Sequence, residues 1–285
     1  MIPMHRRTWK IDFTVHVENN TGRHLSNAVM KVGLYSLDLH QEIVKISQTP
    51  PAKIKMGGEK NYYALVKVKS LSPNEIFTYK LSLVVKTTAM SFFVPPFKLE
   101  EYPPQILRNY TAGTTFWETF SPKIKQVANG LFLKSGNDLN QYIRNTFLFV
   151  NQEIKLKQPL MTRFGASKAL MLHEGDCDEL SDLFITLLRV NRIPARRIVG
   201  YFLKIKSKED IVAEPHAWAE VYFPTAGWVS FDPALGYYAR ISSSHFVRAK
   251  LGLVSDKPLY SIKWKGKKDD SLTISDEEVN VSLLE

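Results

Sequence analysis

Cysteine is nearly absent from this chain: Cys177 is the only one among 285 residues. A single cysteine excludes an internal disulfide and a cysteine-rich zinc site. Long apolar runs are also absent, and none approaches the roughly 20 residues of a membrane-spanning helix, so we expect no membrane span. Residues 1–20 lack the apolar segment of a secretory signal. One cysteine and no leader together predict a cytoplasmic protein.

Acidic residues are fewer than basic ones, which leaves a formal net charge of +10. The basic residues are scattered, however, and no Gly-rich phosphate loop, zinc pattern or basic helix accompanies them. The densest cluster, Lys263–Lys268, runs directly into Asp269 and Asp270 and is typical of a charged hairpin loop. We therefore expect no nucleic-acid partner and only a general attraction to acidic partners. No calcium loop of the Asp-x-Asp-x-Asp-Gly type is present, and we expect neither a metal nor another cofactor.

Before residue 95 the chain shows the alternation of apolar and polar residues that is typical of β-strands. Residues 9–17 place Trp9, Ile11, Phe13, Val15 and Val17 between polar neighbours. Four further strand-like runs follow, with turn residues between them: Ala28–Leu39, Glu42–Ser47, Asn61–Lys69 and Glu75–Thr87. Short strands at regular spacing without helices predict an antiparallel β-sandwich in residues 1–97. The alternative is a sheet that lies on the rest of the molecule.

A second domain, of α+β class, is expected in residues 98–285. The Pro-containing stretch Phe93–Phe97 is the expected linker. Helical segments are expected near Pro122–Leu133 and Asp138–Phe149. Strands are expected between Ser271 and Leu284, and the sequence leaves open whether they belong to this domain or pack against the N-terminal sheet.

The surroundings of Cys177 predict a helix start. Asp176 and Glu179 form a capping-box pattern, and Gly175 supplies the turn before it. Apolar residues then recur at helical spacing: Leu180, Leu183, Phe184, Leu187 and Leu188. Cys177 is therefore expected to be the first residue of the helix. Backbone N–H groups and the positive end of the helix dipole favour a thiolate there, and the same N–H groups are available to an oxyanion.

Two interpretations of Cys177 remain open at this point, a small buried hydrophobic residue and a nucleophile. Four anionic neighbours oppose a thiolate: Glu174, Asp176, Asp178 and Glu179. The nucleophile interpretation therefore requires a cationic partner, for which a histidine is the natural candidate.

His216 has the most distinctive setting of the seven histidines. It opens a strand-like run that ends at Phe223, and a second such run begins at Trp228 and ends at Asp232. This pattern predicts a hairpin whose ends carry His216 and Asp232. A tight turn would pair Ala219 with Asp232 instead, so we expect a bulge or a wider loop. Taken alone, each residue is better explained structurally, His216 as a strand-end histidine and Asp232 as an Asp-Pro turn residue.

The remaining polar candidates are interpreted as structural. The other histidines are assigned to the N-terminal domain, to the loop before the helix or to a solvated turn: His5, His16, His24 and His40; His173; and His245. Arg196 and Arg197 follow the expected helix and are interpreted as structural or surface charges.

Three blocks of sequence together resemble the transglutaminase-like core, a superfamily of papain-like cysteine acyltransferases and hydrolases. They are Gly-Asp-Cys-Asp-Glu-Leu from Gly175, with Ile-Pro-Ala-Arg and Val-Gly-Tyr after its helix; His-Ala-Trp-Ala-Glu-Val-Tyr from His216; and Gly-Trp-Val-Ser-Phe-Asp-Pro from Gly227. The resemblance spans Gly175 to Pro233. It implies a core of N-terminal helices packed on an antiparallel sheet. It also implies that Cys177 is the nucleophile, His216 the general acid/base and Asp232 the residue that orients His216.

The resemblance implies cysteine-dependent acyl transfer on protein or peptide carboxamides through a thioester. An amine acceptor would give transamidation, whereas water would give deamidation or proteolysis, and the sequence leaves the acceptor open. The expected partners are a protein or peptide substrate and, for transamidation, a primary amine. A second oxyanion donor is not assigned; Gln152 and Gln158 are candidates, each better explained as a surface residue. The alternative function is a catalytically silent binding or scaffold protein that keeps the fold.

Overall fold

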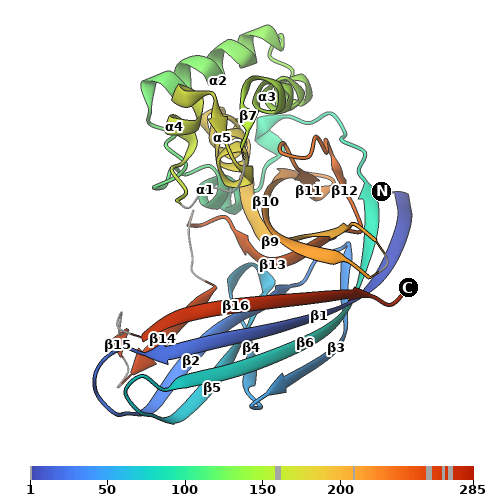
Figure 1. Cartoon of the computed structure of the whole chain (residues 1–285). Helices are drawn as coiled ribbons and strands as arrows, with labels where there is room; N and C mark the ends of the chain where they lie inside the picture. Colours follow the sequence, from blue (N-terminus) through green and yellow to red (C-terminus); the bar gives the residue numbers. More distant parts are fainter. Residues whose placement is uncertain (1, 158–161, 208, 255–258, 265–266, 269–271) are drawn as a thin grey trace.

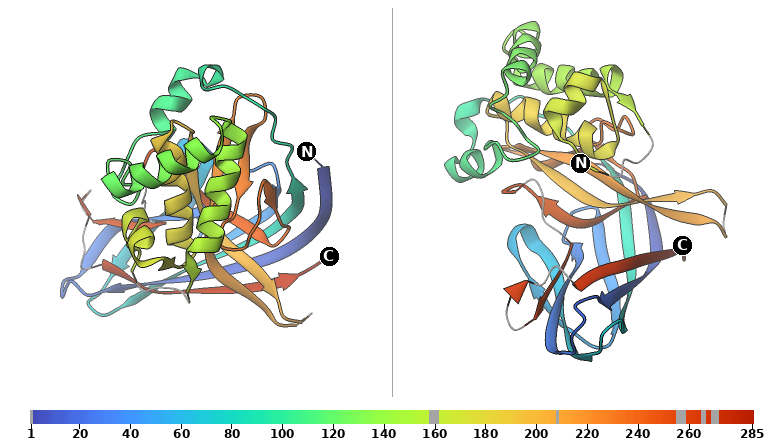
Figure 2. Two further views of the ribbon diagram at one scale, coloured as in Figure 1. Left: turned by 90° about the horizontal axis from the view of Figure 1, so that it is seen from above. Right: turned by 60° about the vertical axis from the view of Figure 1, so that its left-hand side comes forward.

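The computed structural model describes residues 2–157, 162–207, 209–254, 259–264, 267–268 and 272–285, and they are arranged in layers (Figure 1). A group of helices covers a central antiparallel sheet, and a β-sandwich lies on the other side of that sheet. The right-hand view of Figure 2 shows the same order of layers. The predicted α+β fold class, with a strand-rich region before the core, is confirmed.

The β-sandwich is built from two antiparallel sheets. One sheet contains β1 (Ile2–Asn19), β3 (Gln41–Thr49), β6 (Ile76–Ser91), β12 (Arg240–Ile241) and β16 (Leu272–Leu283). The other contains β2 (Leu25–Ser36), β4 (Lys53–Met56), β5 (Asn61–Leu71), β14 (Tyr260–Trp264) and β15 (Lys267–Lys268). The alternation predicted for residues 9–17 places five apolar side chains of β1 between the sheets: Trp9, Ile11, Phe13, Val15 and Val17. Their burial is a main source of the sandwich's stability.

Two strands near the C-terminus lie in the sheets of the sandwich. β16 pairs with β1 from Trp9↔Leu283 to Asn19↔Leu272, and β14 pairs with β2. The pairing answers the question that the sequence left open for the strands after Ser271: they join the N-terminal sheet. Val279, Val281 and Leu283 pack against the sandwich core. The division into separate domains 1–97 and 98–285 stays a prediction. β14 and β16 belong to the second of these ranges but pair with strands of the first.

The hairpin expected at the Lys-rich cluster joins β14 to β15, with Lys263 paired to Lys268; residues 265–266 lie outside the described part. Among the described residues no helix is both long and apolar enough to cross a membrane.

The described part of the helical layer contains the 3-10 helix η2 (Leu99–Glu101) and the following α-helices: α1 (Pro104–Tyr110), α2 (Pro122–Lys134), α3 (Leu139–Glu153), α4 (Ala166–Leu172) and α5 (Cys177–Val190). Pro122 occupies the first turn of α2, and Asp138 caps α3 by accepting the N–H of Gln141 at 2.8 Å. Helix α5 is buried from Glu179 to Arg189 because it lies at the centre of the layer. Its apolar side chains meet those of α2, α3 and the central sheet in one core.

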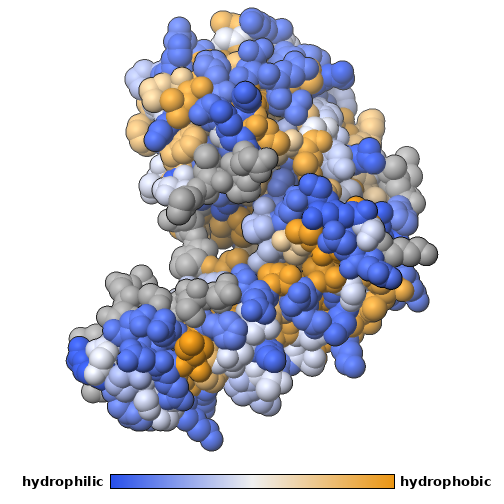
Figure 3. Space-filling view, in the orientation of Figure 1, coloured by the Kyte–Doolittle hydropathy of each residue, from blue (hydrophilic) through white to orange (hydrophobic). Residues whose placement is uncertain are grey.

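The central sheet has the order β11-β10-β9-β13, made of β9 (Ala195–Ile205), β10 (Ile211–Phe223), β11 (Gly227–Phe231) and β13 (His245–Leu251). It contributes to both neighbouring cores. Ala219, Val221 and Phe231 pack with the helices. Tyr201, Leu203 and Phe246 pack with the sandwich, where Phe13 lies 5.9 Å from the ring of Tyr201. On one face, a hollow separates the helices from the outer end of the sandwich (Figure 3).

Gly200 lies at a close approach of β13 to β9. It pairs with His216 of β10 on one side and with Val247 of β13 on the other. A Cβ atom at residue 200 would lie 1.8 Å from the carbonyl oxygen of Phe246, a distance that no side chain tolerates. Only glycine permits this spacing of the strands.

Candidate active site

Cys177 is the first residue of α5, as the sequence predicts. Asp176 caps the helix by accepting the N–H of Asp178 at 2.8 Å, and Glu179 accepts the N–H of Asp176 at 3.2 Å. This is the predicted capping box. A Cβ at Gly175 would lie 2.4 Å from Cβ of Glu179, so this position needs glycine. The helix start is thus tightly built, and it leaves the Cys177 side chain partly exposed.

Two of the four anionic neighbours of Cys177 form ion pairs. Glu174 pairs with Lys157 at 2.8 Å, and Asp178 forms an ion pair with the buried guanidinium of Arg197. Burial, assisted by Asp176, raises the pKa of Glu179 to about 7, although the N–H of Phe164 partly offsets it. Arg197 is therefore more than a surface charge, because it offsets the carboxylate next to Cys177.

His216 and Asp232 meet at the expected end of the hairpin. His216 Nε2 lies 2.7 Å from Asp232 Oδ2, and both side chains are buried. The expected bulge or wide loop is not needed. The register runs without a shift from Phe223↔Gly227 to Ala219↔Phe231, and Asp232 follows directly. The two side chains meet along the diagonal of the hairpin, a separation that an imidazole and a carboxylate can bridge.

The imidazole of His216 lies between the thiol of Cys177 and the carboxylate of Asp232. Nε2 of His216 is occupied by Asp232, which leaves Nδ1 for Cys177. Burial lowers the pKa of His216, but the charge and hydrogen bond of Asp232 and the contact with Cys177 outweigh it and raise the pKa to about 10. For the acidic Asp232, burial acts in the other direction and raises the pKa, but His216 and His245 hold the pKa of this carboxyl well below its usual range. Ser181 donates to the carbonyl of Ala217 at 3.1 Å and so fixes α5 against the strand that carries His216.

His245 is not the solvated turn residue that the sequence suggested. It is fully buried, begins β13, and places Nε2 3.1 Å from Asp232 Oδ2. Its Nδ1 lies 2.9 Å from Ser242 Oγ. The apolar residues that follow, Phe246 and Val247, are the signal that a strand begins here.

Comparison with known proteins identifies the family of this site. A model of the transglutaminase-like superfamily matches residues 125–233, which include Cys177, His216 and Asp232. Residues 125–233 are a transglutaminase-like domain. The resemblance predicted from the three sequence blocks is thereby confirmed.

The relatives of the transglutaminase-like domain are distant or partial. Over 72 residues the chain is 39% identical to the uncharacterized protein YebA of Bacillus subtilis (strain 168); the match covers 22% of this chain and only 10% of YebA. A candidate cysteine protease from Cytophaga hutchinsonii has the same fold, with a TM-score of 0.70 over 100% of this chain and 93% of its own, at 15% identity. Red sea bream transglutaminase reaches a TM-score of 0.36 at 15% identity, over 74% of this chain and 46% of its own.

The other polar candidates lie within residues 125–233 but do not join the Cys177 site. Arg196 is paired with Glu220 at 2.6 Å and lies over the ring of Trp228, which agrees with a structural role. Gln152 is exposed near the end of α3, and Gln158 lies outside the described residues.

Asp176 takes up the N–H groups of Asp178 and Glu179. The Cys177 N–H is therefore the candidate oxyanion donor at the helix start.

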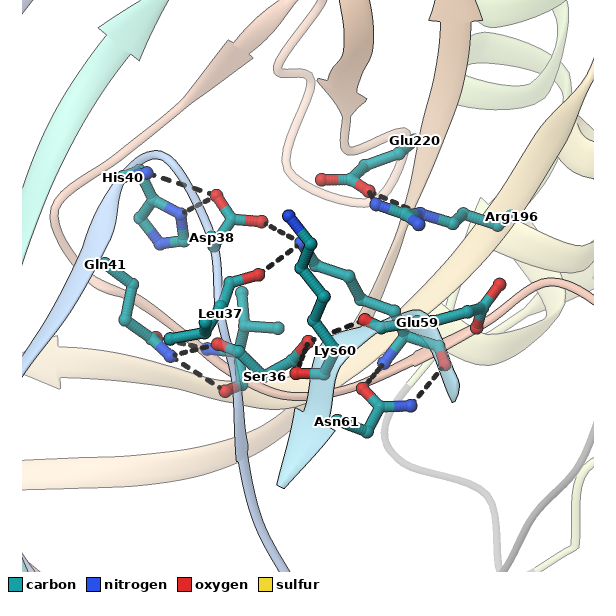
Figure 4. A network of polar contacts seen from close by, with 12 residues as sticks. Ser36, Leu37, Asp38, His40, Gln41, Glu59, Lys60, Asn61, Arg196 and Glu220 are labelled. Atoms are coloured by element: carbon teal, nitrogen blue, oxygen red, sulfur yellow. Dashed lines mark hydrogen bonds and ion pairs between the residues drawn. The ribbon is translucent and has the colours of Figure 1, made fainter. Parts of the chain in front are cut away.

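A cavity of about 450 Å³ lies between the sandwich and the β10–β11 hairpin. Its charged walls include the pairs Asp38–Lys250 and Arg196–Glu220, and Figure 4 shows Asp38 bonded to His40 beside it. Neither Cys177 nor His216 lines this cavity. It is distinct from the candidate active site.

The ring nitrogens of His216 and His245 and the Asp232 carboxylate lie within 4.8 Å of one another. Hydrogen bonds among them already use Nε2 of both rings and the carboxylate, and the side chains of Asp232 and His245 are buried. The cluster is therefore better described as a hydrogen-bonded unit than as a metal centre.

Proposed function

We propose that this chain is a cysteine-dependent acyltransferase or hydrolase that acts on protein or peptide carboxamides. Cys177 would be the nucleophile, His216 the general acid/base and Asp232 the residue that orients His216. The observation that carries the proposal is the His216–Asp232 pair, 2.7 Å apart, beside Cys177 at the start of α5. The protein of the same fold from Cytophaga hutchinsonii is described as a candidate cysteine protease, which agrees with this chemistry.

The first half of the reaction forms a thioester. The Cys177 thiolate attacks the carboxamide carbon, and the carbonyl oxygen becomes an oxyanion near the Cys177 N–H. His216 starts as an imidazolium, which its pKa of about 10 favours at neutral pH. It gives its proton to the departing nitrogen as the C–N bond breaks, and it is left neutral with Asp232 still bonded to Nε2.

The second half releases the acyl group. Neutral His216 takes a proton from water or from a primary amine, which attacks the thioester carbon as the C–S bond breaks. Thiolate and imidazolium are regenerated together. An amine would give transamidation, and water would give deamidation or cleavage of a peptide bond.

Intact-mass spectrometry tests the proposal and identifies the acceptor. The protein is incubated with a glutamine-containing protein, such as casein, and a labelled primary amine. Incorporation of label indicates transfer, the small mass gain from replacing an amide nitrogen by oxygen indicates deamidation, and fragments indicate proteolysis. None of these products should form with Cys177→Ala.

Unmodified substrate together with an unreactive Cys177 would support the alternative, a catalytically silent scaffold of the same fold. Alkylation of Cys177 separates that case from a wrong choice of substrate, because a competent nucleophile reacts with iodoacetamide whatever its natural substrate is.

A further inference from the structure

Two histidines hold the Asp232 carboxylate, and only one of them belongs to the proposed triad. His245 Nε2 approaches Asp232 Oδ2 at 3.1 Å, and His216 Nε2 approaches the same oxygen at 2.7 Å. His245 lies beyond the residues that the family model matches, and its side chain has no exposed surface. Its ring is therefore closed off from solvent.

The hydrogen bonds around His245 determine which ring nitrogen carries hydrogen. Asp232 is ionised because its pKa is held low, so it accepts, and His245 Nε2 must donate. Nδ1 then accepts the hydroxyl hydrogen of Ser242 at 2.9 Å. The neutral ring satisfies both contacts. Burial also lowers the pKa of His245, and the hydrogen bond and charge of Asp232 offset this only in part.

We propose that His245 is a positioning residue of the acyl-transfer site, which holds the Asp232 carboxylate in the place and charge state from which it orients His216. This inference rests on the proposed function. It adds a residue from β13 to a site otherwise formed by α5 and the β10–β11 hairpin.

Asp232 needs such a partner because it is almost completely buried. Its Oδ1 accepts the N–H of Leu235 at 3.0 Å, and Oδ2 faces the two imidazoles. A buried carboxylate that loses a donor binds its proton more tightly. A neutral donor is well suited to this place, because a second cation would repel the imidazolium of His216.

Contacts with the sandwich fix the position of β13 and therefore of His245. His40, from the loop between β2 and β3, places Nε2 3.0 Å from the carbonyl oxygen of His245, and its Nδ1 lies 2.8 Å from Asp38. Asp38 also pairs with Lys250 of β13 at 2.6 Å. One loop of the sandwich, whose Asp38 and His40 are drawn in Figure 4, thus holds β13 at His245 and at Lys250.

The titratable groups that face His245 come from three places: Asp232 after β11, His216 on β10 and His40 in the β2–β3 loop. The rings of Phe202, Trp218 and Tyr237 cover the remaining sides. Loss of the His245 donor therefore acts first on Asp232. A more basic Asp232 draws the shared proton away from His216, so the Cys177 thiolate loses positive charge beside it and forms only at higher pH.

The test is the pH dependence of Cys177 alkylation by iodoacetamide in the full chain, with His245→Leu and His245→Gln. Leucine removes the donor, whereas glutamine keeps an N–H donor of similar reach. We expect His245→Leu to move the acid limb upward by about one pH unit, as loss of a hydrogen bond to a charged group implies. His245→Gln should restore most of the shift. His24→Leu, in the exposed contact with Ser70, is the control and should change nothing.

Three results overturn the inference: an unchanged acid limb in His245→Leu, an equal shift in both His245 variants, or a shift in His24→Leu. If His245→Leu does not fold by circular dichroism, Ser242→Ala replaces it, because it removes the donor to Nδ1. A smaller upward shift is then expected, and no shift overturns the inference. Failure of the proposed function looks different, since Cys177 of the unmodified protein would then react no faster than a free thiol.

Discussion

Asp232 reaches His216 along the diagonal of the β10–β11 hairpin, although the register pairs Ala219 with Phe231. Asp232 follows the last residue of β11, and His216 lies within β10, three residues before Ala219, so the contact depends on register and on the path of the chain after β11. A slip of one residue would turn Asp232 to the other side of the sheet. The hairpin therefore sets the geometry of the proposed general base.

Asp232→Asn should lower kcat by roughly 100- to 10,000-fold with a much smaller change in KM, because orientation of the base matters mainly in the transition state. Combined with Cys177→Ala it should add no further loss, since residues that act as a unit are not additive. Steady-state kinetics on whichever substrate the mass assay identifies provide the measurement. Asp210→Asn, an exposed carboxylate paired with Lys206, is the matched control. Full activity of Asp232→Asn would mean that another residue orients His216.

Cys177 should react with iodoacetamide at about pH 6 much faster than an unperturbed thiol, which is almost wholly protonated there. The helix start and the adjacent His216 both favour the thiolate. Alkylation is followed by mass spectrometry, and Cys177 is the only site to be counted. Cys177→Ala should abolish turnover and leave the thermal transition nearly unchanged. A rate no higher than that of a cysteine peptide would return Cys177 to a structural role.

Arg197→Met should slow the alkylation of Cys177 at about pH 6 by roughly fivefold to tenfold, because it leaves Asp178 uncompensated beside the thiolate. Asp178→Asn in the same chain should restore much of the rate. Arg196→Met is the matched control: Arg196 is the preceding residue, is also buried and is also paired, but with Glu220. Equal effects of the two arginine changes would indicate general destabilisation rather than an effect on the thiol.

Stability should fall as pH rises from about 6.5 to about 10. The folded-state pKa of His216 lies near 10, above the value of 6.5 in an unfolded chain. A raised pKa contributes stability that is fully present below the unfolded value and is lost as pH rises through the folded value, on the order of 5 kcal/mol here. Urea unfolding at several pH values measures it, and His216→Gln should flatten this part of the profile. An equally steep profile in His216→Gln would assign the loss to other groups.

A fragment that begins at residue 98 tests the predicted division into two domains. It would lack β1 and β2, the partners of β16 and β14, so Val279, Val281 and Leu283 would lose the core they pack against. We expect this fragment to be insoluble or unfolded, and co-expression with residues 1–97 to restore a soluble complex. A well-folded fragment by circular dichroism would instead show that the predicted domains fold separately.

Local features of the site were predictable from the sequence because they depend on near neighbours. The capping box of Asp176 and Glu179 and the helix beginning at Cys177 follow from spacing within a few residues. The His216–Asp232 hairpin follows from two strand-like runs and the turn between them. The expected bulge was wrong because the prediction considered only directly opposite residues and ignored the diagonal.

Contacts between distant parts of the chain were not predictable in this way. His40 and His245 are 205 residues apart, and nothing local to either indicates their contact. Arg197 was assigned to the structure or the surface because its partner Asp178 lies on a different element. His245 was interpreted as a turn residue, and its burial depends on residues distant in the chain, among them His40 and the rings of Phe202 and Trp218.

Gly200 has no side chain, yet it influences how the strands that carry His216 and His245 are spaced. It is paired with His216 on one strand and lies against the carbonyl of Phe246, the neighbour of His245, on the other. A methyl group there would collide with the Phe246 backbone and push β13 away from β9, and so it would separate the two histidines that share Asp232. Directed evolution of this protein for new substrates therefore has good reason to hold residue 200 fixed and to place diversity elsewhere.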